Sequence, residues 1–382
     1  MKTKLLSLLL AALFCLSLTA CNTPETGETQ SPAPPTASAE EPATSPTGSE
    51  RAEYILASAD TVLNTNAGYE IGVSELEHWT DDDTAPMVYY TSDISPESLV
   101  AIYQALGREA AGNVAVKLST GENGSNYLDP NLIKDLVQSV NGTIVECNTA
   151  YGGNRAETAM HYQLVEDHGF TAIADVDIMD EDGSMSIPVE GGTHLTEDLV
   201  GSHLANYDFV LVLSHFKGHS QGGFGGAMKN ISIGIASSEG KNIIHTAGET
   251  NEAWIPFDNF RFMNNEGEDH NNFIESMAEA AKAVSDYEDN GEKMLYISVM
   301  NHLSVDCDCV ENPAEATMHD VAILASTDPV ALDQACIDIV YAAPDSADLI
   351  ERIESRNGLL ILDHAAEIGL GSRAYQLTDI GA

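Results

Sequence analysis

The chain has 382 residues, with 60 acidic and 16 basic side chains and a formal net charge of −44 at pH 7. This excess of negative charge opposes association with nucleic acid or with an anionic lipid surface, so neither is expected as a partner. A small anionic molecule can bind only where the few lysine and arginine side chains gather, because the overall field of the protein repels it.

The N-terminus has the pattern of a bacterial lipoprotein. Two lysines precede an apolar run over residues 5–18, and residues 18–21, LTAC, have the form of a lipobox. The run is shorter than the roughly 20 residues that a membrane-spanning helix needs. We predict that residues 1–20 are a lipoprotein signal peptide and that Cys21 is lipidated. The lipid would be the protein's only contact with the membrane, and would hold it on the extracytoplasmic face.

Residues 21–52 are rich in threonine, proline, serine and glutamate, with few large apolar side chains. Such a composition cannot bury enough apolar surface to fold, which predicts a disordered tether. Residues 53–382 are long enough for a large hydrophobic core, in one domain or in two lobes.

Strand and helix patterns alternate along this region. Proline after a capping residue predicts helices that begin beside Ser95, Asp129 and Asp328, and two more helices are expected at 155–168 and 271–287. Short apolar runs predict buried strands at 113–118, 143–147, 208–213, 294–299 and 321–325. The βαβα order indicates an α/β protein with a largely parallel, open, Rossmann-like sheet and helices on both faces.

The segment 214–241, SHFKGHSQGGFGGAMKNISIGIASSEGK, gathers positive charge in an otherwise acidic chain. The apolar strand at 208–213 leads into it. If extended backbone continues, then His215, Lys217 and His219 share one face, because side chains alternate along a strand. We interpret this segment as the functional site, with these three residues as the candidate catalytic groups. The alternative is a tight strand-to-helix turn whose charged side chains are only solvated.

Several residues of this segment suit an anionic ligand. Glycines let the backbone approach a ligand, and the amides that open a following helix attract anions. The expected anion-binding residues of the segment are Gly222, Gly223, Gly225, Gly226, Lys229, Asn230 and Lys241. The histidine pair could instead hold a transition metal, and a metal that binds an anionic cofactor would combine both interpretations.

Long motifs resemble a known family. The segments SHFKGH, GGFGGAMKN and SSEGK, together with VAVKLSTGENG, CNTAYGGNR, DHGF, DCDC and ILASTDPVALDQA, are similar to domain of unknown function family 362, often labelled as uncharacterised iron-sulfur-centre proteins. The likeness extends from about residue 85 onward and implies no settled reaction. Many relatives carry an insert with four closely spaced cysteines, and no cysteine lies between residues 241 and 300.

An iron-sulfur cluster is therefore not expected here, since it would need all of Cys147, Cys307, Cys309 and Cys336. Cys336 lies in an apolar helical pattern typical of a core residue. Cys147 ends a predicted strand beside the site. The pair in DCDC could be metal ligands, a disulfide or free thiols. Candidate metal ligands are thus His215, His219, His245, Cys307 and Cys309.

Two further loops follow predicted strands at the same sheet edge, where open α/β sheets bind ligands. Lys117 is either a cation of the cleft or a surface lysine, and Asn148 and Arg155 either contact a ligand or stabilise a helix start. The leading hypothesis is an extracytoplasmic lipoprotein that binds an anionic cofactor or substrate, with a metal, and performs redox or proton-transfer chemistry. The cofactor itself is unknown. The alternatives are a non-catalytic metal- or solute-binding lipoprotein and an iron-sulfur electron carrier.

Overall fold

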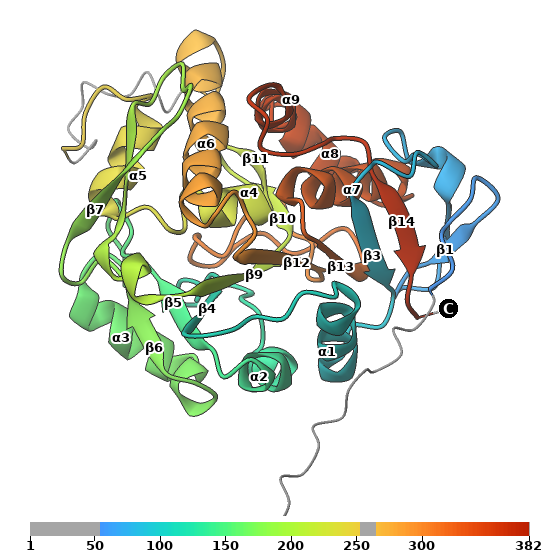
Figure 1. Ribbon diagram of the computed structural model, residues 1–382, viewed down its shortest axis with the longest axis horizontal. Coiled ribbons are helices and arrows are strands. Elements are labelled where there is room, and N and C mark those ends of the chain that lie inside the picture. Colours follow the sequence, from blue (N-terminus) through green and yellow to red (C-terminus); the bar gives the residue numbers. More distant parts are fainter. Residues whose placement is uncertain (1–53, 253–264, 382) are drawn as a thin grey trace, which may run out of the picture. The chain divides into compact units, whose positions relative to one another are not determined.

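A mixed sheet forms the centre of the computed structural model, which describes residues 54–252 and 265–381. Within these residues the sheet has eight strands, in the spatial order β14 (Gln376–Asp379), β3 (Met87–Thr91), β13 (Ala322–Ser326), β12 (Met294–Met300), β9 (Phe209–His215), β4 (Val114–Lys117), β5 (Thr143–Glu146) and β6 (Val176–Ile178) (Figure 1). The predicted signal peptide, tether and lipidated Cys21 lie outside the described residues. None of the described helices is long and apolar enough to cross a membrane.

The sheet is largely parallel, as the alternating sequence pattern predicts. Strand β13 is the exception, because it runs antiparallel to both β12 and β3, while the other five pairings are parallel. The chain between β12 and β13 contains no helix. A parallel return needs a long crossover connection, usually a helix, and this segment supplies none, so the chain comes back in the opposite direction.

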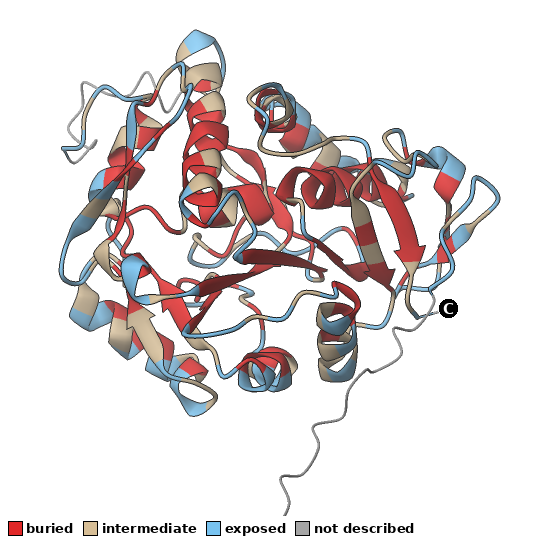
Figure 2. Cartoon of the chain, viewed as in Figure 1, coloured by how far each residue is buried: buried red, intermediate tan, exposed pale blue. Residues whose placement is uncertain are grey.

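Helices cover both faces of the sheet, and the described residues belong to one compact unit rather than two lobes. One face carries α1 (Pro96–Ala105), α2 (Pro130–Ser139) and α3 (Thr158–Asp167). The other face carries α4 (Ala227–Ile231), α5 (Ser238–His245), α6 (Glu268–Tyr287), α7 (Pro329–Ala342), α8 (Ala347–Glu354) and α9 (Leu360–Glu367). Side chains alternate between two cores, so Val210 and Val212 of β9 pack on one face and Leu211 and Leu213 on the other. The inner strands of the sheet are buried, whereas the outer helix faces are exposed (Figure 2).

The predicted helix starts are confirmed by their caps. Ser95 accepts a hydrogen bond from the amide of Ser98, and Asp328 accepts from two amides of α7. Asp129 caps α2 in the same way. Each cap satisfies an amide that has no partner within its helix, and proline fixes the first helical turn. The helix expected at 155–168 begins only at Thr158.

Shorter elements complete the fold. Hairpin-like pairs join β1 (Val62–Asn64) to β2 (Glu70–Gly72), β7 (Ser184–Pro188) to β8 (Glu197–Gly201), and β10 (Lys217–His219) to β11 (Gly223–Gly225). The described part of the chain also has short 3-10 helices at η1 (Val73–Glu75), η2 (Phe170–Ala172) and η3 (Ser202–Asn206).

The strand order creates a switch point between β4 and β9. From β4 the chain continues to β5 on one side, and from β9 it continues to β12 on the other side. Because the two connections diverge, a crevice forms at the carboxyl ends of these adjacent strands, the usual place for a ligand in an open α/β sheet.

Candidate anion-binding site

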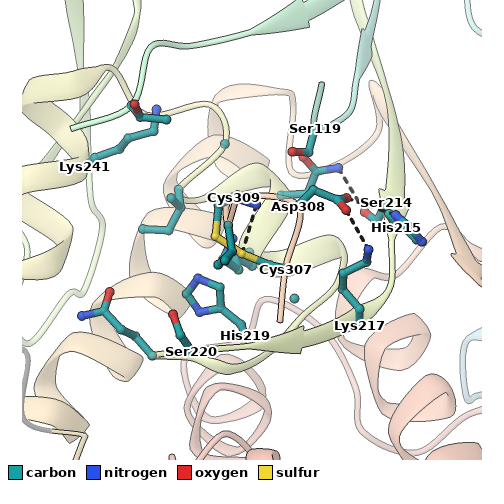
Figure 3. Close-up of a pocket in the computed structure, with 18 of the residues that line it drawn as sticks. Ser119, Ser214, His215, Lys217, His219, Ser220, Lys241, Cys307, Asp308 and Cys309 are labelled. Carbon is teal, nitrogen blue, oxygen red and sulfur yellow. Dashed lines mark hydrogen bonds and ion pairs between the residues drawn. A yellow bond between two sulfur atoms is a disulfide. The ribbon is translucent and has the colours of Figure 1, made fainter. Parts of the chain in front are cut away.

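A cavity of about 520 Å³ lies at this switch point. A cavity of this volume suits a small molecule. It is lined by side chains from the ends of β4, β5 and β9, from the β10 hairpin, from α4 and α5 and from later loops. Figure 3 shows His215, Lys217, His219 and Asp308 in this lining. The charged, imidazole and sulfur-bearing residues of the lining are Lys117, Glu146, Cys147, Arg155, His215, Lys217, His219, Lys229, Lys241, His245, Cys307, Asp308, Cys309 and Arg356.

The comb of His215, Lys217 and His219 exists and faces the cavity. Strand β9 ends at His215, and β10 carries the other two side chains on to its pairing with β11. Close packing requires glycine at position 218, because a Cβ there would lie 2.3 Å from the carbonyl oxygen of Val305. The hairpin is thereby pressed against the loop that contains the DCDC motif.

The glycines of the segment divide into two groups. Gly225 and Gly226 line the cavity, whereas Gly222 and Gly223 are not among its lining residues. Gly223 has a φ of +79°, which glycine adopts without steric cost, and its neighbour Gly222 donates its amide to His219. These two glycines shape the turn of the hairpin rather than a ligand surface.

The expectation that the amides of α4 face the ligand is wrong. The amides of Ala227 and Met228 donate to the carboxylate of Asp333, at 2.7 and 3.0 Å. Asp333 lies in α7 and is fully buried. Its carboxyl oxygens occupy the positions that an anion would need, so this helix end is already capped.

Asp308 holds two members of the comb in place. The ammonium group of Lys217 donates to one carboxylate oxygen at 2.7 Å, and Nδ1 of His215 donates to the other at 3.0 Å (Figure 3). Burial alone would raise the pKa of Asp308, but the charges of His215 and Lys217 lower it to about 2. The carboxylate is therefore ionised, and it binds the DCDC loop to the HFK strand.

A second buried carboxylate, Glu146, lies at the end of β5. It accepts from Lys117 Nζ at 3.0 Å, from Arg155 Nη1 at 3.1 Å and from the amide of Thr120 at 3.0 Å. Burial would raise the pKa of Glu146, yet Lys117 and Arg155 lower it to about 2. The three charges form an internal network in which each group has its partners.

Lys117 lines the cavity but has no donor left for a ligand. Besides Glu146, its ammonium group donates to the carbonyl of Leu118 at 2.7 Å and to the side chain of Asn230 at 3.0 Å. The amide of Asn230 in turn donates to the carbonyls of Lys117 and Leu213. These two residues therefore clamp the ends of β4 and β9 together at the switch point, and they shape the wall of the site.

Arg155 and Asn148 are placed differently from each other. Arg155 lines the cavity, and its guanidinium donates to Glu122 at 3.0 Å and to the hydroxyl of Tyr151 at 3.2 Å as well as to Glu146. Asn148 is not among the lining residues, because its amide donates to Thr158 at 2.9 Å beside the start of α3. For Asn148 the geometry supports the helix-start alternative.

Two lysines of the cavity have no carboxylate partner among the described residues, and the same holds for Arg356, whose guanidinium donates to Ser220 and Ser355. Lys229 has no hydrogen bond or ion pair to any described residue, and Lys241 donates to the carbonyl of Ala236 but meets no carboxylate. Burial, followed by the charges of Arg155 and Lys117, lowers the pKa of Lys229 to about 8. An anionic ligand would relieve the mutual repulsion of these cations.

His219 and His245 are both neutral, and their hydrogen bonds show which ring nitrogen carries the hydrogen. Nδ1 of His219 accepts from the amide of Gly222 at 2.8 Å, so the neutral ring carries its hydrogen on Nε2. Burial lowers the pKa of His219 well below its usual value, with Lys229 adding to the effect, and the ring stays neutral. His245 donates from Nδ1 to the carbonyl of Lys241 at 2.6 Å, and burial lowers its pKa to about 4. The unprotonated nitrogen of His245 is therefore Nε2.

Metal ligation does not fit these side chains as they stand. Both nitrogens of His215 face oxygen acceptors, at Asp308 and at the carbonyl of Asn301. Cys307 and Cys309 form a disulfide, which decides between the three alternatives that the sequence left open. His219 and the two sulfurs lie within 4.8 Å of one another, but the disulfide occupies both sulfurs.

An iron-sulfur cluster does not fit either. Cys336 is a buried free thiol inside α7 and is not among the lining residues, whereas Cys147 lines the cavity. The four cysteines that a cluster would need therefore do not converge on one point.

Sequence reasoning passed over three charged residues of the site. Glu146 carries a recognisable signal, an acidic residue at the end of an apolar strand, which is the same pattern that marked Lys117. Asp308 lies between the two cysteines of the DCDC motif, and the pattern points to the cysteines rather than to the carboxylate. Arg356 comes from the chain after α8 and donates to the carbonyl of Ser220 at 2.7 Å, and no local pattern marks it.

The sheet, its switch point and the cationic cavity define an α/β protein with a cavity of small-molecule size at the carboxyl ends of its strands. A family model described as domain of unknown function (DUF362) matches residues 114–338, and the chain belongs to this family. The match includes β4, β5 and the comb, so the resemblance read from the motifs is confirmed. A search of curated proteins finds no match.

Two solved structures show distant likeness. One is the lactate racemase apoprotein from Thermoanaerobacterium thermosaccharolyticum, at 14% identity and a TM-score of 0.36, with 74% of this chain and 62% of that chain covered. The other is a protein from Thermotoga maritima, at 13% identity and a TM-score of 0.39, with 66% and 58% covered. The chain thus spans about three fifths of the length of each, and likenesses this distant imply no shared site.

Proposed function

We propose that this protein is an extracytoplasmic bacterial lipoprotein that binds a small organic anion in the cavity at the switch point. The observation that carries the proposal is the pair Lys229 and Lys241, two cationic side chains that line the cavity without a carboxylate partner among the described residues. Lys241 is buried and Lys229 is half-buried. Charges withdrawn from water are normally paired, so two such lysines indicate that a ligand supplies the negative charge.

The charge balance of the cavity supports the same conclusion. Its lining includes six lysine or arginine side chains and two carboxylates, an excess of four positive charges. Both carboxylates are neutralised by their own partners, Asp308 by His215 and Lys217 and Glu146 by Lys117 and Arg155. In a protein of net charge −44, a local excess of this sign favours a ligand with two or more negative groups.

Proton-transfer chemistry on the bound anion is a second element of the proposal. His219 presents a neutral ring with its hydrogen on Nε2. This N–H can donate a hydrogen bond to negative charge that develops on the ligand during a proton transfer, the role of a neutral imidazole as an electrophile rather than as a general acid.

Metal capture is the alternative function, and one observation favours it. Reduction of the disulfide would leave two sulfur ligands with His219 within reach. Such a set suits a soft or borderline metal. It would also require His219 to lose the hydrogen bond from the amide of Gly222 to its Nδ1. A metal on Nδ1 would replace that bond directly. A metal on Nε2 would move the ring hydrogen to Nδ1, which could then no longer accept a hydrogen bond.

The direct test is equilibrium binding of small anions to the full chain. Succinate, citrate and inorganic phosphate would be titrated calorimetrically into the wild type, into the double variant Lys229→Met, Lys241→Met, and into Lys134→Met, whose lysine is exposed on α2. The proposal expects binding of at least one anion by the wild type and the control, and its loss in the double variant. No binding of any of the three anions, or equal binding by all three proteins, would contradict it.

Metal capture is tested in parallel. The oxidised and the chemically reduced protein would each be titrated with zinc under argon, with the reductant removed beforehand. One equivalent of tightly bound zinc in the reduced protein, together with no binding of anions, would favour the alternative.

A further inference from the structure

The disulfide of the DCDC loop forms part of the cavity wall. Cys307 and Cys309 both line the cavity, where Cys307 is 6% exposed and Cys309 is half-buried (Figure 3). Cys309 is therefore the more exposed of the two residues. A molecule held in the anion site would lie beside this bond.

The disulfide contributes little to holding its loop. A bond between residues two apart closes a very short loop, and the stabilisation from a cross-link falls as the loop it closes shortens. The loop has other anchors, because Asp308 between the two cysteines binds Lys217 and His215, and its carbonyl accepts from the amide of Glu122 at 2.8 Å. The loop can therefore keep its place when the disulfide opens.

The surroundings stabilise a thiolate at Cys307. The amide of Cys309 donates to Cys307 Sγ at 3.3 Å, and His219 lies within 4.8 Å of both sulfurs (Figure 3). The negative charge of Asp308, which would oppose a thiolate next to it in sequence, is neutralised by its two cationic partners. A stabilised thiolate is a better leaving group in thiol–disulfide exchange.

We propose that the cavity is a thiol–disulfide exchange site for small anionic thiols, in which Lys229 and Lys241 hold the anionic groups of the thiol and Cys309 receives its sulfur. The inference rests on the proposed anion binding and adds the substrate class. Carboxylate-bearing thiols have both features that the cavity matches, a negative charge and a nucleophilic sulfur.

In this exchange two ligand thiols reduce the Cys307–Cys309 disulfide by two electrons. The thiolate of the first ligand attacks Cys309 Sγ, the bond to Cys307 breaks, and Cys307 leaves as a thiolate. A second thiolate attacks the ligand sulfur of the mixed disulfide, which releases the ligand disulfide and the thiolate of Cys309. Two thiols are oxidised to one disulfide, and the two protons they lose protonate the two cysteines or pass to solvent.

Reduction rates under argon test this inference. The oxidised full chain would be mixed with mercaptosuccinate or with the neutral thiol 2-mercaptoethanol, and samples would be alkylated and analysed by peptide mass spectrometry. Each rate is divided by the rate at which the same thiol reduces a small model disulfide. This corrected rate no longer depends on the difference in intrinsic reactivity between the two thiols. Cys336, a buried free thiol that does not line the cavity, is followed on a separate peptide, so that alkylation after unfolding is detected.

The corrected rate is expected to be about tenfold or more higher for mercaptosuccinate, the effect of one or two charge-assisted contacts. The ratio of the corrected rate for mercaptosuccinate to that for 2-mercaptoethanol should fall towards one in Lys229→Met and should keep its wild-type value in Lys134→Met. In addition, Cys307→Ser should trap mercaptosuccinate on Cys309 as a mixed disulfide once Cys309 has been activated as a disulfide with a small aromatic thiol. A disulfide that resists both thiols, or that reacts with both at equal corrected rates, would overturn the inference.

Succinate separates this failure from failure of the anion site, because it carries the same two carboxylates without a thiol. If succinate binds in the cavity and mercaptosuccinate still has no kinetic advantage, then the exchange inference fails and the anion site stands. If succinate does not bind and no preference is seen, then both fail.

Discussion

The charge of Lys229 should control anion affinity in a way that depends on pH. Replacement by methionine keeps the length and apolar stem of the side chain and removes only the ammonium group. The pKa of Lys229 is lowered to about 8 by burial and by the neighbouring cations Arg155 and Lys117, so at pH 7 roughly nine-tenths of the molecules carry the charge.

The size of the effect follows from the missing contact. A hydrogen bond from a charged donor contributes about 1.5–3 kcal/mol, so Lys229→Met should weaken anion binding at pH 7 by roughly 10- to 150-fold. Above pH 8 the wild-type amine loses its proton, and its affinity should fall by about tenfold per pH unit until it approaches that of the variant. The variant itself should lack this step.

Calorimetric titration at half-unit steps from pH 6 to pH 9.5 would measure both features with the anion that binds most tightly. Lys134→Met serves as the matched control, because it removes an exposed lysine of α2 and should reproduce the wild-type curve. Dissociation constants of Lys229→Met within twofold of the wild type at pH 7, or the same pH step in both proteins, would refute the reasoning.

Three further predictions concern charge pairing, pH-dependent stability and membrane attachment. Lys117→Met should lower the free energy of unfolding by about 3–5 kcal/mol in a urea titration, because Glu146 loses one of its two cations in a buried site, and a loss below 1 kcal/mol would contradict this. Glu288 is buried, and burial raises the pKa of its carboxyl to about 7. The folded protein therefore holds a proton that the unfolded chain releases near pH 4.5, so stability falls as pH rises between these values. Glu288→Gln should match the wild type near pH 4.5 and be up to about 3 kcal/mol more stable above pH 7, whereas a constant difference across this range would contradict the assignment. Finally, Cys21→Ser should release the protein from the membrane fraction of an expressing bacterium and abolish incorporation of labelled fatty acid, and retention of the label would exclude lipidation at this residue.

Much of the fold could be predicted because its signals are local. Ser95, Asp129 and Asp328 each precede a proline, and each caps the helix that the pattern predicts. Strand positions followed from short apolar runs that are buried on both faces. The direction of β13 was not predictable in this way, because the direction of a strand depends on the connection that leads to it. The connection from β12 to β13 is a long irregular segment without a helix, and no local pattern marks it.

The candidate site likewise has features that follow from local sequence and others that depend on distant parts of the chain. The face shared by His215, Lys217 and His219 is dictated by strand alternation within five residues, so the sequence by itself determined that these side chains would meet one cavity. It also determined family membership, because the motifs are long and contiguous.

Which of the charges remain available to a ligand was decided only by the tertiary structure. Lys117 and Lys229 are equivalent in sequence terms, yet Lys117 is neutralised by Glu146, 29 residues away, and Lys229 meets no carboxylate among the described residues. Lys217 is paired with Asp308, 91 residues away. Likewise the DCDC spacing permits a disulfide, thiols or a metal site. Pairing energies depend on distances across the fold, and residues so far apart along the chain acquire those distances only when the sheet brings its strand ends together.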